Sequence, residues 1–287
     1  MSDTAANPSA DASTTTTEAP QALLQASGVT MRFGGLLAVD RVDFDVYPGE
    51  IVGLIGPNGA GKTTFFNCLT GLYRPTAGRV IFNGSVLPPK PRKVVQAGMA
   101  RTFQNIRLFS NMTAVENVMV GRYCRTSSGP LTSIIRGPKF RREERETAAK
   151  AHELLDFVGL APAAENLARN LPYGDQRKLE IARALATDPK MLLLDEPTAG
   201  MNPLETRQTE DLIFKIRDSG LAVITIEHDM RFIFNLCDRV LCLVGGRPLV
   251  LGTPDVVQSD PRVIEAYIGT GADAEDGEAN GDADGDA

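Results

Sequence analysis

Cysteine, histidine and long apolar runs are all scarce in this chain of 287 residues. No apolar stretch approaches the roughly 18 residues that a membrane-spanning helix needs, so we expect the chain not to cross a bilayer itself. The first 22 residues lack the basic start and apolar core of a secretory signal. The four cysteines are scattered and form no CxxC pair, which argues against a disulfide framework or a zinc site and favours the reducing cytoplasm. The only histidines, His152 and His228, are too few for a His-rich metal site.

Acidic residues outnumber basic ones only because of the two ends. The formal net charge is −6, from 36 acidic and 30 basic residues. Residues 1–22 and 271–287 hold 10 of the acids and no lysine or arginine, so 30 bases face 26 acids in between. Both ends are poor in large apolar residues and cannot offset the entropy cost of ordering. We therefore expect a disordered N-terminal tail at 1–22 and a disordered acidic tail at 271–287.

Helices and strands alternate along most of the chain. Short apolar runs between turn residues predict strands at Leu23–Thr30, Val42–Val46, Ile51–Ile55, Arg79–Asn83, Met191–Leu194, Leu221–Ile226 and Arg239–Val244. Apolar spacing and capping signals predict helices after Thr113 and at Lys139–Val158, Arg177–Ala186 and Pro203–Asp218. Asn202 is the expected N-cap of the last helix, with Pro203 at its first position. This order predicts an α/β fold with a mostly parallel sheet and helices on its faces.

A glycine-rich segment at 56–63 fits the pattern GxxxxGK[ST] between the predicted strand Ile51–Ile55 and a helical run. Its glycines allow successive N–H groups to point at phosphate oxygens, and the following helix adds its positive end. Lys62 is placed to reach the β- and γ-phosphates, and Thr63 to put its hydroxyl on Mg²⁺. An ordinary glycine-rich turn is the alternative, but the flanking elements favour a nucleotide site. Its predicted members are Gly56, Pro57, Asn58, Gly59, Ala60, Gly61, Lys62, Thr63 and Thr64.

Two carboxylates follow the apolar strand Met191–Leu194. Ligands gather at the carboxyl ends of strands in an open parallel sheet, so Asp195 is placed to hold Mg²⁺ directly or through water. Glu196 points to the other side and can orient or deprotonate an attacking water. Two adjacent acidic residues at the end of a strand more often belong to a solvated loop. The presence of a phosphate loop in the same chain favours the catalytic interpretation.

A compact turn at 171–176 leads into the helix predicted at Arg177–Ala186, and the amides around Gly174 offer a second anion site there. With this turn, the chain resembles the ATP-binding subunits of ABC transporters over about residues 23–270. Segments 56–63 and 191–196 resemble the family's Walker A and Walker B motifs, and segment 171–176 resembles its signature motif (LSGGQ). Gln104 in Arg-Thr-Phe-Gln resembles the Q-loop glutamine, and residues 199–202 stand where the D-loop lies. His228 resembles the switch histidine. Phe33 stands where the family places an adenine-stacking aromatic.

The resemblance implies a P-loop NTPase (RecA-like) core at 23–104 and 171–270, with an N-terminal antiparallel β subdomain and a helical subdomain inserted at 105–170. It implies ATP and Mg²⁺ as cofactors, bound between two head-to-tail cassettes. The implied catalytic residues are Glu196, His228 and Gln104, and the implied metal ligands are Thr63, Gln104 and Asp195. Tyr173, Gly174, Asp175 and Gln176 of one copy would contact the ATP held by the other.

The Tyr-Gly-Asp-Gln signature, the basic segment 122–142 and Glu-His-Asp-Met at 227–230 narrow the resemblance to the larger ATPase subunit of branched-chain amino acid importers. The implied partners are integral membrane permease subunits, a second ATPase subunit (identical or smaller) and, indirectly, a substrate-binding protein. The implied place is the cytoplasmic face of the inner (plasma) membrane, as a peripheral protein. Importers of urea, amides or another small polar solute, and a soluble ABC-type ATPase of DNA repair or translation, remain alternatives. Glu196 and His228 argue against a third alternative, a nucleotide-binding regulatory module without turnover.

Three features stay open at this point. Pro172 replaces the signature serine and has neither a side-chain donor nor an N–H, so contact with the γ-phosphate would depend on the amides around Gly174. Asn202 replaces the D-loop aspartate and keeps an acceptor without the charge. The basic segment 122–142 is either a solvated loop or a contact with lipid headgroups or the membrane subunit. We expect no nucleic-acid partner, because no base-reading element accompanies these bases.

Overall fold

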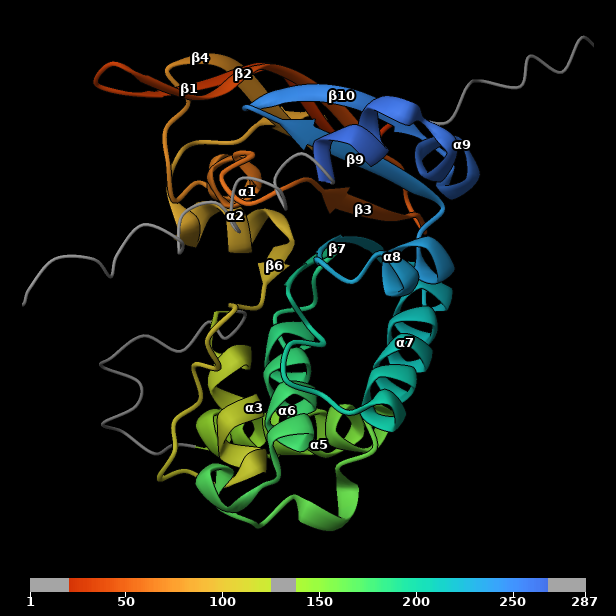
Figure 1. Ribbon diagram of the computed structural model, residues 1–287. Helices are drawn as coiled ribbons and strands as arrows, with labels where there is room; N and C mark the ends of the chain where they lie inside the picture. Colours follow the sequence, from red (N-terminus) through yellow and green to blue (C-terminus); the bar gives the residue numbers. More distant parts are fainter. Residues whose placement is uncertain (1–20, 125–137, 268–287) are drawn as a thin grey trace, which may run out of the picture.

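The computed structural model describes residues 21–124 and 138–267 (Figure 1). The disorder expected for 1–22 and 271–287 therefore concerns residues outside the described ranges, apart from 21 and 22. Most of the basic segment 122–142 also lies outside them.

A six-stranded sheet lies at the centre of the fold, in the order β10-β9-β3-β8-β7-β6. Its strands are β3 (Ile51–Ile55), β6 (Met99–Arg101), β7 (Met191–Asp195), β8 (Ala222–Ile226), β9 (Arg239–Val244) and β10 (Arg247–Gly252). Only β10 pairs antiparallel with its neighbour; the other pairs are parallel. Every residue of β3, β7 and β8 is buried, as expected for strands covered on both faces. The predicted mostly parallel sheet is confirmed.

A second, antiparallel sheet is built largely from the N-terminal part of the chain. Its order is β2-β1-β4-β5, with β1 (Leu24–Phe33), β2 (Leu36–Val46), β4 (Ala77–Phe82) and β5 (Ser85–Val86). The predicted strand Leu23–Thr30 continues to Phe33, because its ladder with β2 runs down to the Phe33–Leu36 pair beside the turn. Helix α1 (Lys62–Leu69) lies between the two sheets and shares one apolar cluster with both.

One of the remaining helices joins the apolar cluster of α1 through Val94, and the others cover the other face of the six-stranded sheet or form a separate group. The remaining helices are α2 (Pro91–Ala97), α3 (Ala114–Arg122), α5 (Pro138–Phe157), α6 (Tyr173–Leu185), α7 (Pro203–Asp218), α8 (Met230–Leu236) and α9 (Pro254–Ser259), with 3₁₀ turns at Ala161–Ala163 and Ala168–Asn170. In Figure 1, α3, α5 and α6 gather at the end of the molecule opposite the antiparallel sheet. Helix α6, which the sequence analysis assigns to the core range, packs against α3 and α5.

The capping predictions are confirmed. Thr113 and Glu116 form a capping box at the start of α3, and Asn202 caps α7 with Pro203 at its first position. Helix α6 differs from its predicted start, since it begins at Tyr173 rather than Arg177. The Gln176 N–H donates to the Pro172 carbonyl at 2.9 Å, which closes a helical turn earlier than apolar spacing indicates.

Helices α3 and α6 approach each other closely at Gly121. A Cβ at this position would lie 2.2 Å from the Arg183 carbonyl oxygen. We predict that Gly121→Ala lowers the free energy of unfolding by about 1–2 kcal/mol, because overpacking outweighs the gain in helix propensity. Gly35→Ala is the matched control, since nothing lies within 4 Å of the added Cβ, and its effect stays within about 0.5 kcal/mol. Equal denaturant midpoints for the two variants would contradict the close approach.

Candidate active site

Four neighbouring parallel strands end at one edge of the central sheet. They stand in the order β3-β8-β7-β6. The phosphate loop follows β3, the pair Glu227–His228 follows β8, Glu196 follows Asp195 at the end of β7, and Gln104 comes shortly after β6. Parallel pairing thus brings segments that are far apart in the sequence to the edge where ligands of such sheets bind.

The phosphate loop owes its shape to glycines with positive φ angles. Gly56 has φ 147°, and a Cβ there would lie 2.1 Å from the Leu243 carbonyl oxygen. Gly61 has φ 92°, and its Cβ would meet the Ala38 carbonyl oxygen at 2.3 Å. Gly59, at φ 76°, instead faces open space within 4 Å and is exposed. Gly56 and Gly61 therefore allow the loop to pack closely against the protein backbone. Gly59 leaves the outer face of the loop clear for phosphate oxygens.

Lys62 begins α1 and folds its side chain back over this loop. Its ammonium donates to the carbonyls of Gly56 and Pro57, the latter at 3.0 Å. Burial lowers the pKa of Lys62, and the negative charge of Glu196 opposes that shift. The predicted phosphate-binding lysine therefore lies within electrostatic reach of the predicted catalytic acid.

Two of the predicted catalytic residues are in direct contact. The Gln104 side-chain amide donates from Nε2 to Glu196 Oε2 at 2.9 Å. Glu196 has φ 48°, and its N–H donates to the Ile226 carbonyl at 2.9 Å. A left-handed conformation at a residue other than glycine costs about 1–3 kcal/mol and persists only where the surroundings fix it. The bend after β7 thus turns the Glu196 carboxylate toward the Q-loop.

Asp195, the predicted magnesium ligand, forms a buried ion pair that the sequence analysis missed. Arg101 Nη2 lies 2.6 Å from Asp195 Oδ2, with the side chains 9% and 8% exposed. Arg101 is the last residue of β6 and stands in the Arg-Thr-Phe-Gln segment that supplies Gln104. A basic residue at the end of a buried strand is the signal that could have found it.

His228 lies at the surface beside a buried acid. Its side chain is 73% exposed, whereas that of Glu227 is 0% exposed. Glu227 Oε1 accepts from the N–H and the hydroxyl of Thr198, at 2.8 and 2.6 Å. Burial raises the pKa of Glu227, and these hydrogen bonds oppose the shift. The acid therefore joins the segment that carries His228 to the start of the D-loop, a link that sequence reasoning missed.

The signature segment forms the first turn of α6. Pro172 is the N-cap and makes no side-chain capping bond, in keeping with its lack of a donor or acceptor there. Gly174 is buried, and a Cβ on it would lie 3.0 Å from Glu205 Oε1 at the start of α7. Arg177 donates to the carbonyls of Phe103, at 2.7 Å, and Gln104. Through Arg177, the signature helix is tied to the Q-loop.

Phe33 lies away from these contacts, on the antiparallel sheet. It is 42% exposed and packs edge-on against Tyr73, with ring centroids 5.4 Å apart. Its adenine-stacking role stays a prediction.

A further contact reaches the phosphate loop from the C-terminal part of the chain. The Gly56 N–H donates to the Tyr267 hydroxyl at 2.7 Å. Burial raises the pKa of Tyr267 to about 12, so this oxygen stays a neutral phenol at any working pH. No sequence motif indicates this contact.

The donors at this edge suit Mg²⁺ bound together with nucleotide phosphates. Within residues 21–124 and 138–267, no group of three or more His, Cys, Asp or Glu is arranged to hold a metal ion. Mg²⁺ commonly uses one or two carboxylates together with substrate phosphates and water. Asp195 supplies one carboxylate, and Thr63 is exposed at the start of α1. The residues present therefore fit the ion.

Comparison with known proteins decides the family. A model described as ABC transporter matches residues 39–199, and one described as branched-chain amino acid ATP-binding cassette transporter matches residues 247–273. The chain belongs to the ABC transporter ATP-binding cassettes. The cassette is thus an ATP-hydrolysing transporter subunit, and the predicted family, fold class and enzyme activity are confirmed.

The cassette matches its relatives over most of their lengths. It is 45% identical over 251 residues to the high-affinity branched-chain amino acid transport ATP-binding protein LivG of Escherichia coli (strain K12), covering 87% of this chain and 98% of LivG. It is 46% identical over 249 residues to BraF of Pseudomonas aeruginosa, with 86% and 98% covered. A crystal structure of the ADP conformation of an ATP-binding cassette of an ABC transporter gives a TM-score of 0.76 at 32% identity, covering 87% of this chain and 99% of that chain.

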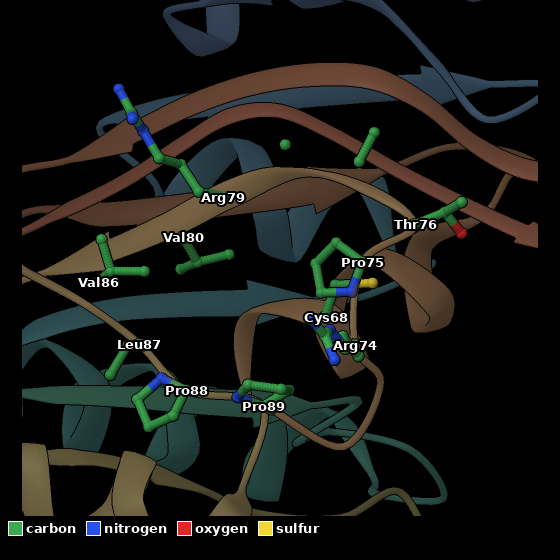
Figure 2. Close-up of a pocket in the computed structure, with 13 residues that line it drawn as sticks. Cys68, Arg74, Pro75, Thr76, Arg79, Val80, Val86, Leu87, Pro88 and Pro89 are labelled. Atoms are coloured by element: carbon green, nitrogen blue, oxygen red, sulfur yellow. The ribbon is translucent and has the colours of Figure 1, made fainter.

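Two cavities of similar size open on the surface of the cassette. One, of about 340 Å³, lies between the Q-loop segment and the helical group and is lined by Arg101, Phe103, Phe109, Gly121, Glu180 and Arg183 among others. The other, of about 350 Å³, lies beside α1 and β4, and Figure 2 shows Cys68, Pro75, Pro88 and Pro89 around it. The first borders the segment that carries Gln104, whereas the second adjoins none of the predicted site residues.

Among the residues with described positions, no helix has both the length and the apolar character that crossing a membrane requires.

Glu227 should leave a mark on the pH dependence of stability. Because its pKa is raised in the folded state, the unfolded chain releases this proton first, and stability falls as pH rises through the folded-state pKa. Glu227→Gln keeps an oxygen acceptor for Thr198 and removes the buried charge. We predict that the variant gains melting temperature over the parent at pH 8 and that the gain shrinks toward pH 4. The exposed Glu165→Gln serves as control, and a gain for Glu227→Gln that is equal at both pH values would contradict the prediction.

Proposed function

We propose that this ATPase powers the import of branched-chain amino acids through integral membrane permease subunits, as a peripheral protein on the cytoplasmic face of the inner membrane. The contact of Gln104 with Glu196, close to Lys62, is the observation that carries the hydrolytic part. The names of LivG and BraF, together with the second family model at 247–273, support the amino-acid assignment. Importers of urea or amides remain the alternative, because the amino-acid assignment rests on resemblance to relatives.

The proposed reaction is in-line attack of water on the γ-phosphate of ATP. The loop amides and Lys62 bind the phosphates and offset the charge that develops on the γ-phosphoryl group. Glu196 orients the water and accepts its proton, while Gln104 holds the Glu196 carboxylate and His228 contacts the γ-phosphate. Thr63, Asp195 and Gln104 would hold Mg²⁺, which when bound supplies positive charge beside the phosphates.

We propose that two cassettes close on each ATP, with the same chain or a smaller relative as the second copy. The first turn of α6 supports this, because Tyr173, Gly174 and Asp175 make none of their N–H bonds within the helix. Tyr173 is 45% exposed. With Pro172 unable to donate, the second anion site consists of backbone amides and the positive end of the helix. Tyr173, Gly174, Asp175 and Gln176 are the residues assigned to it.

The cavity of about 340 Å³ beside the Q-loop is the proposed docking place for a permease. Its apolar rim includes Phe109, which is 47% exposed, and Met112 nearby in the sequence is 37% exposed. Charged walls come from Arg183 and Glu180. A partner segment seated there would touch the backbone that leads to Gln104, so docking and hydrolysis would share one element.

The catalytic assignment predicts that binding and turnover separate in two variants. Glu196→Gln should bind ATP within about twofold of the parent and lose at least about a hundredfold in phosphate release, since it removes the proton acceptor but keeps the shape. Lys62→Ala should instead weaken ATP binding, because it removes the phosphate-facing charge. Phosphate release and equilibrium titration with ATP measure the two effects. Turnover of Glu196→Gln at the parent rate would show that Glu196 is not the base.

The substrate assignment predicts which solute stimulates the complete transporter. The cassette, reconstituted in proteoliposomes with its permeases and binding protein, should hydrolyse ATP faster when the binding protein is loaded with leucine. The same complex carrying Glu196→Gln is the control for background hydrolysis. Stimulation by urea or an amide in place of leucine would contradict the amino-acid assignment while leaving the ATPase assignment intact.

A further inference from the structure

We propose that Arg101 is a positioning residue that fixes the Asp195 carboxylate for metal binding and ties it to the phosphate-loop helix and the Q-loop. The inference rests on the proposed role of Asp195 as a magnesium ligand. Arg101 Nη2 lies 2.6 Å from Asp195 Oδ2, and both side chains are more than nine-tenths buried. A charged pair in this environment is held in place, because separating the partners would leave each charge without solvent or a counterion.

The second terminal nitrogen of Arg101 reaches the helix that Lys62 begins. Nη1 donates to Asn67 Oδ1 at 2.6 Å and to Thr70 Oγ1 at 3.2 Å, both on or directly after α1. The two ends of one planar guanidinium therefore connect Asp195 at the end of β7 with the helix that follows the phosphate loop. The distance between the metal ligand and the phosphate-binding elements is set by a rigid fork, which a lysine could not reproduce.

Two aromatic rings pack against this fork. The guanidinium carbon lies 4.9 Å from the centroid of the Phe66 ring and 5.3 Å from that of Phe103. Cation–π contacts of this kind add to an ion pair when the groups are desolvated. Phe103 directly precedes Gln104, so the Q-loop packs on the residue that holds the metal ligand.

The pairing leaves one oxygen of Asp195 for the metal. Oδ2 is taken by Arg101, and within the described residues Oδ1 makes no hydrogen bond. The ion pair restricts the orientation of the carboxylate through Oδ2 and leaves Oδ1 as the oxygen for the metal ion. Partners that orient a ligating carboxylate commonly change metal affinity 10–100-fold when they are removed.

Arg101 also lines the cavity of about 340 Å³ proposed for permease docking. One side chain therefore borders that cavity and holds the carboxylate of Asp195. A segment bound in the cavity would contact the group that orients the metal ligand.

The test is the ratio of nucleotide affinities with Mg²⁺ and with EDTA, measured by fluorescence titration of a non-hydrolysable ATP analogue on the full chain. For Arg101→Lys we expect the affinity in EDTA to stay within about twofold of the parent and the gain from Mg²⁺ to fall about tenfold or more. Asp195→Asn should reduce the same gain, and the double variant should lose no more than Asp195→Asn alone. Arg239→Lys is the matched control, because Arg239 pairs with Asp45 and Glu50 away from this edge.

Each contrary result has its own meaning. An unchanged gain in Asp195→Asn would overturn the proposed metal ligand and the role of Arg101 with it. A reduced gain in Asp195→Asn beside an unchanged gain in Arg101→Lys would overturn the role of Arg101 alone. An equal loss of nucleotide affinity with and without Mg²⁺ in Arg101→Lys would show that Arg101 only supports the fold. A larger gain in affinity from Mg²⁺ in that variant would show that Arg101 competes with the metal ion for Asp195. Asn67→Ala keeps both partners of the ion pair but removes one hydrogen bond that holds the Arg101 guanidinium. We expect this variant to lower the ratio of affinities with Mg²⁺ and with EDTA by less than Arg101→Lys does. An unchanged ratio would count against the proposal.

Discussion

Parallel pairing of β3, β8, β7 and β6 is the constraint on which the active site depends. Parallel strands that hydrogen-bond side by side must end at a common edge, and here that edge receives the phosphate loop, Glu227, Asp195 and, just beyond β6, Gln104. Strand β8 stands between β3 and β7, so the phosphate loop and Asp195 are not direct neighbours. The space between them lies over the end of β8, next to the buried carboxylate of Glu227.

Polar bonds between segments then fix what the sheet brings together. Gln104 holds Glu196, Arg101 holds Asp195, and Thr198 holds Glu227, each with at least one donor–acceptor distance of 2.9 Å or less. Each of these bonds joins residues more than 25 positions apart in the sequence. The loops at the sheet edge are therefore braced by one another, and a shift of the Q-loop must disturb either Glu196 or Arg101.

Much of this arrangement could be predicted from local sequence, and the exceptions have physical reasons. The phosphate loop and the caps at Thr113 and Asn202 depend on residues within a few positions, so their patterns are visible in the sequence. Strand β6 has three residues, which are too few to show the alternation of apolar and polar residues that identifies a strand. It forms because its backbone pairs with that of β7. The contact of Tyr267 with Gly56 joins distant parts of the chain and has no local signal.

The missed arginines follow the same logic and indicate how the helical group communicates with the nucleotide edge. Arg177, buried on α6, donates to the backbone carbonyls of Phe103 and Gln104, while Arg101 packs on the Phe103 ring. Bonds to carbonyls fix the path of the backbone, whereas the ring contact and the ion pair fix a side chain. Because α6 also packs against α3 and α5, a rotation of the helical group would act on the Q-loop backbone through Arg177. The Q-loop is thus joined to the signature helix by Arg177 and packs, through Phe103, on the arginine that holds Asp195.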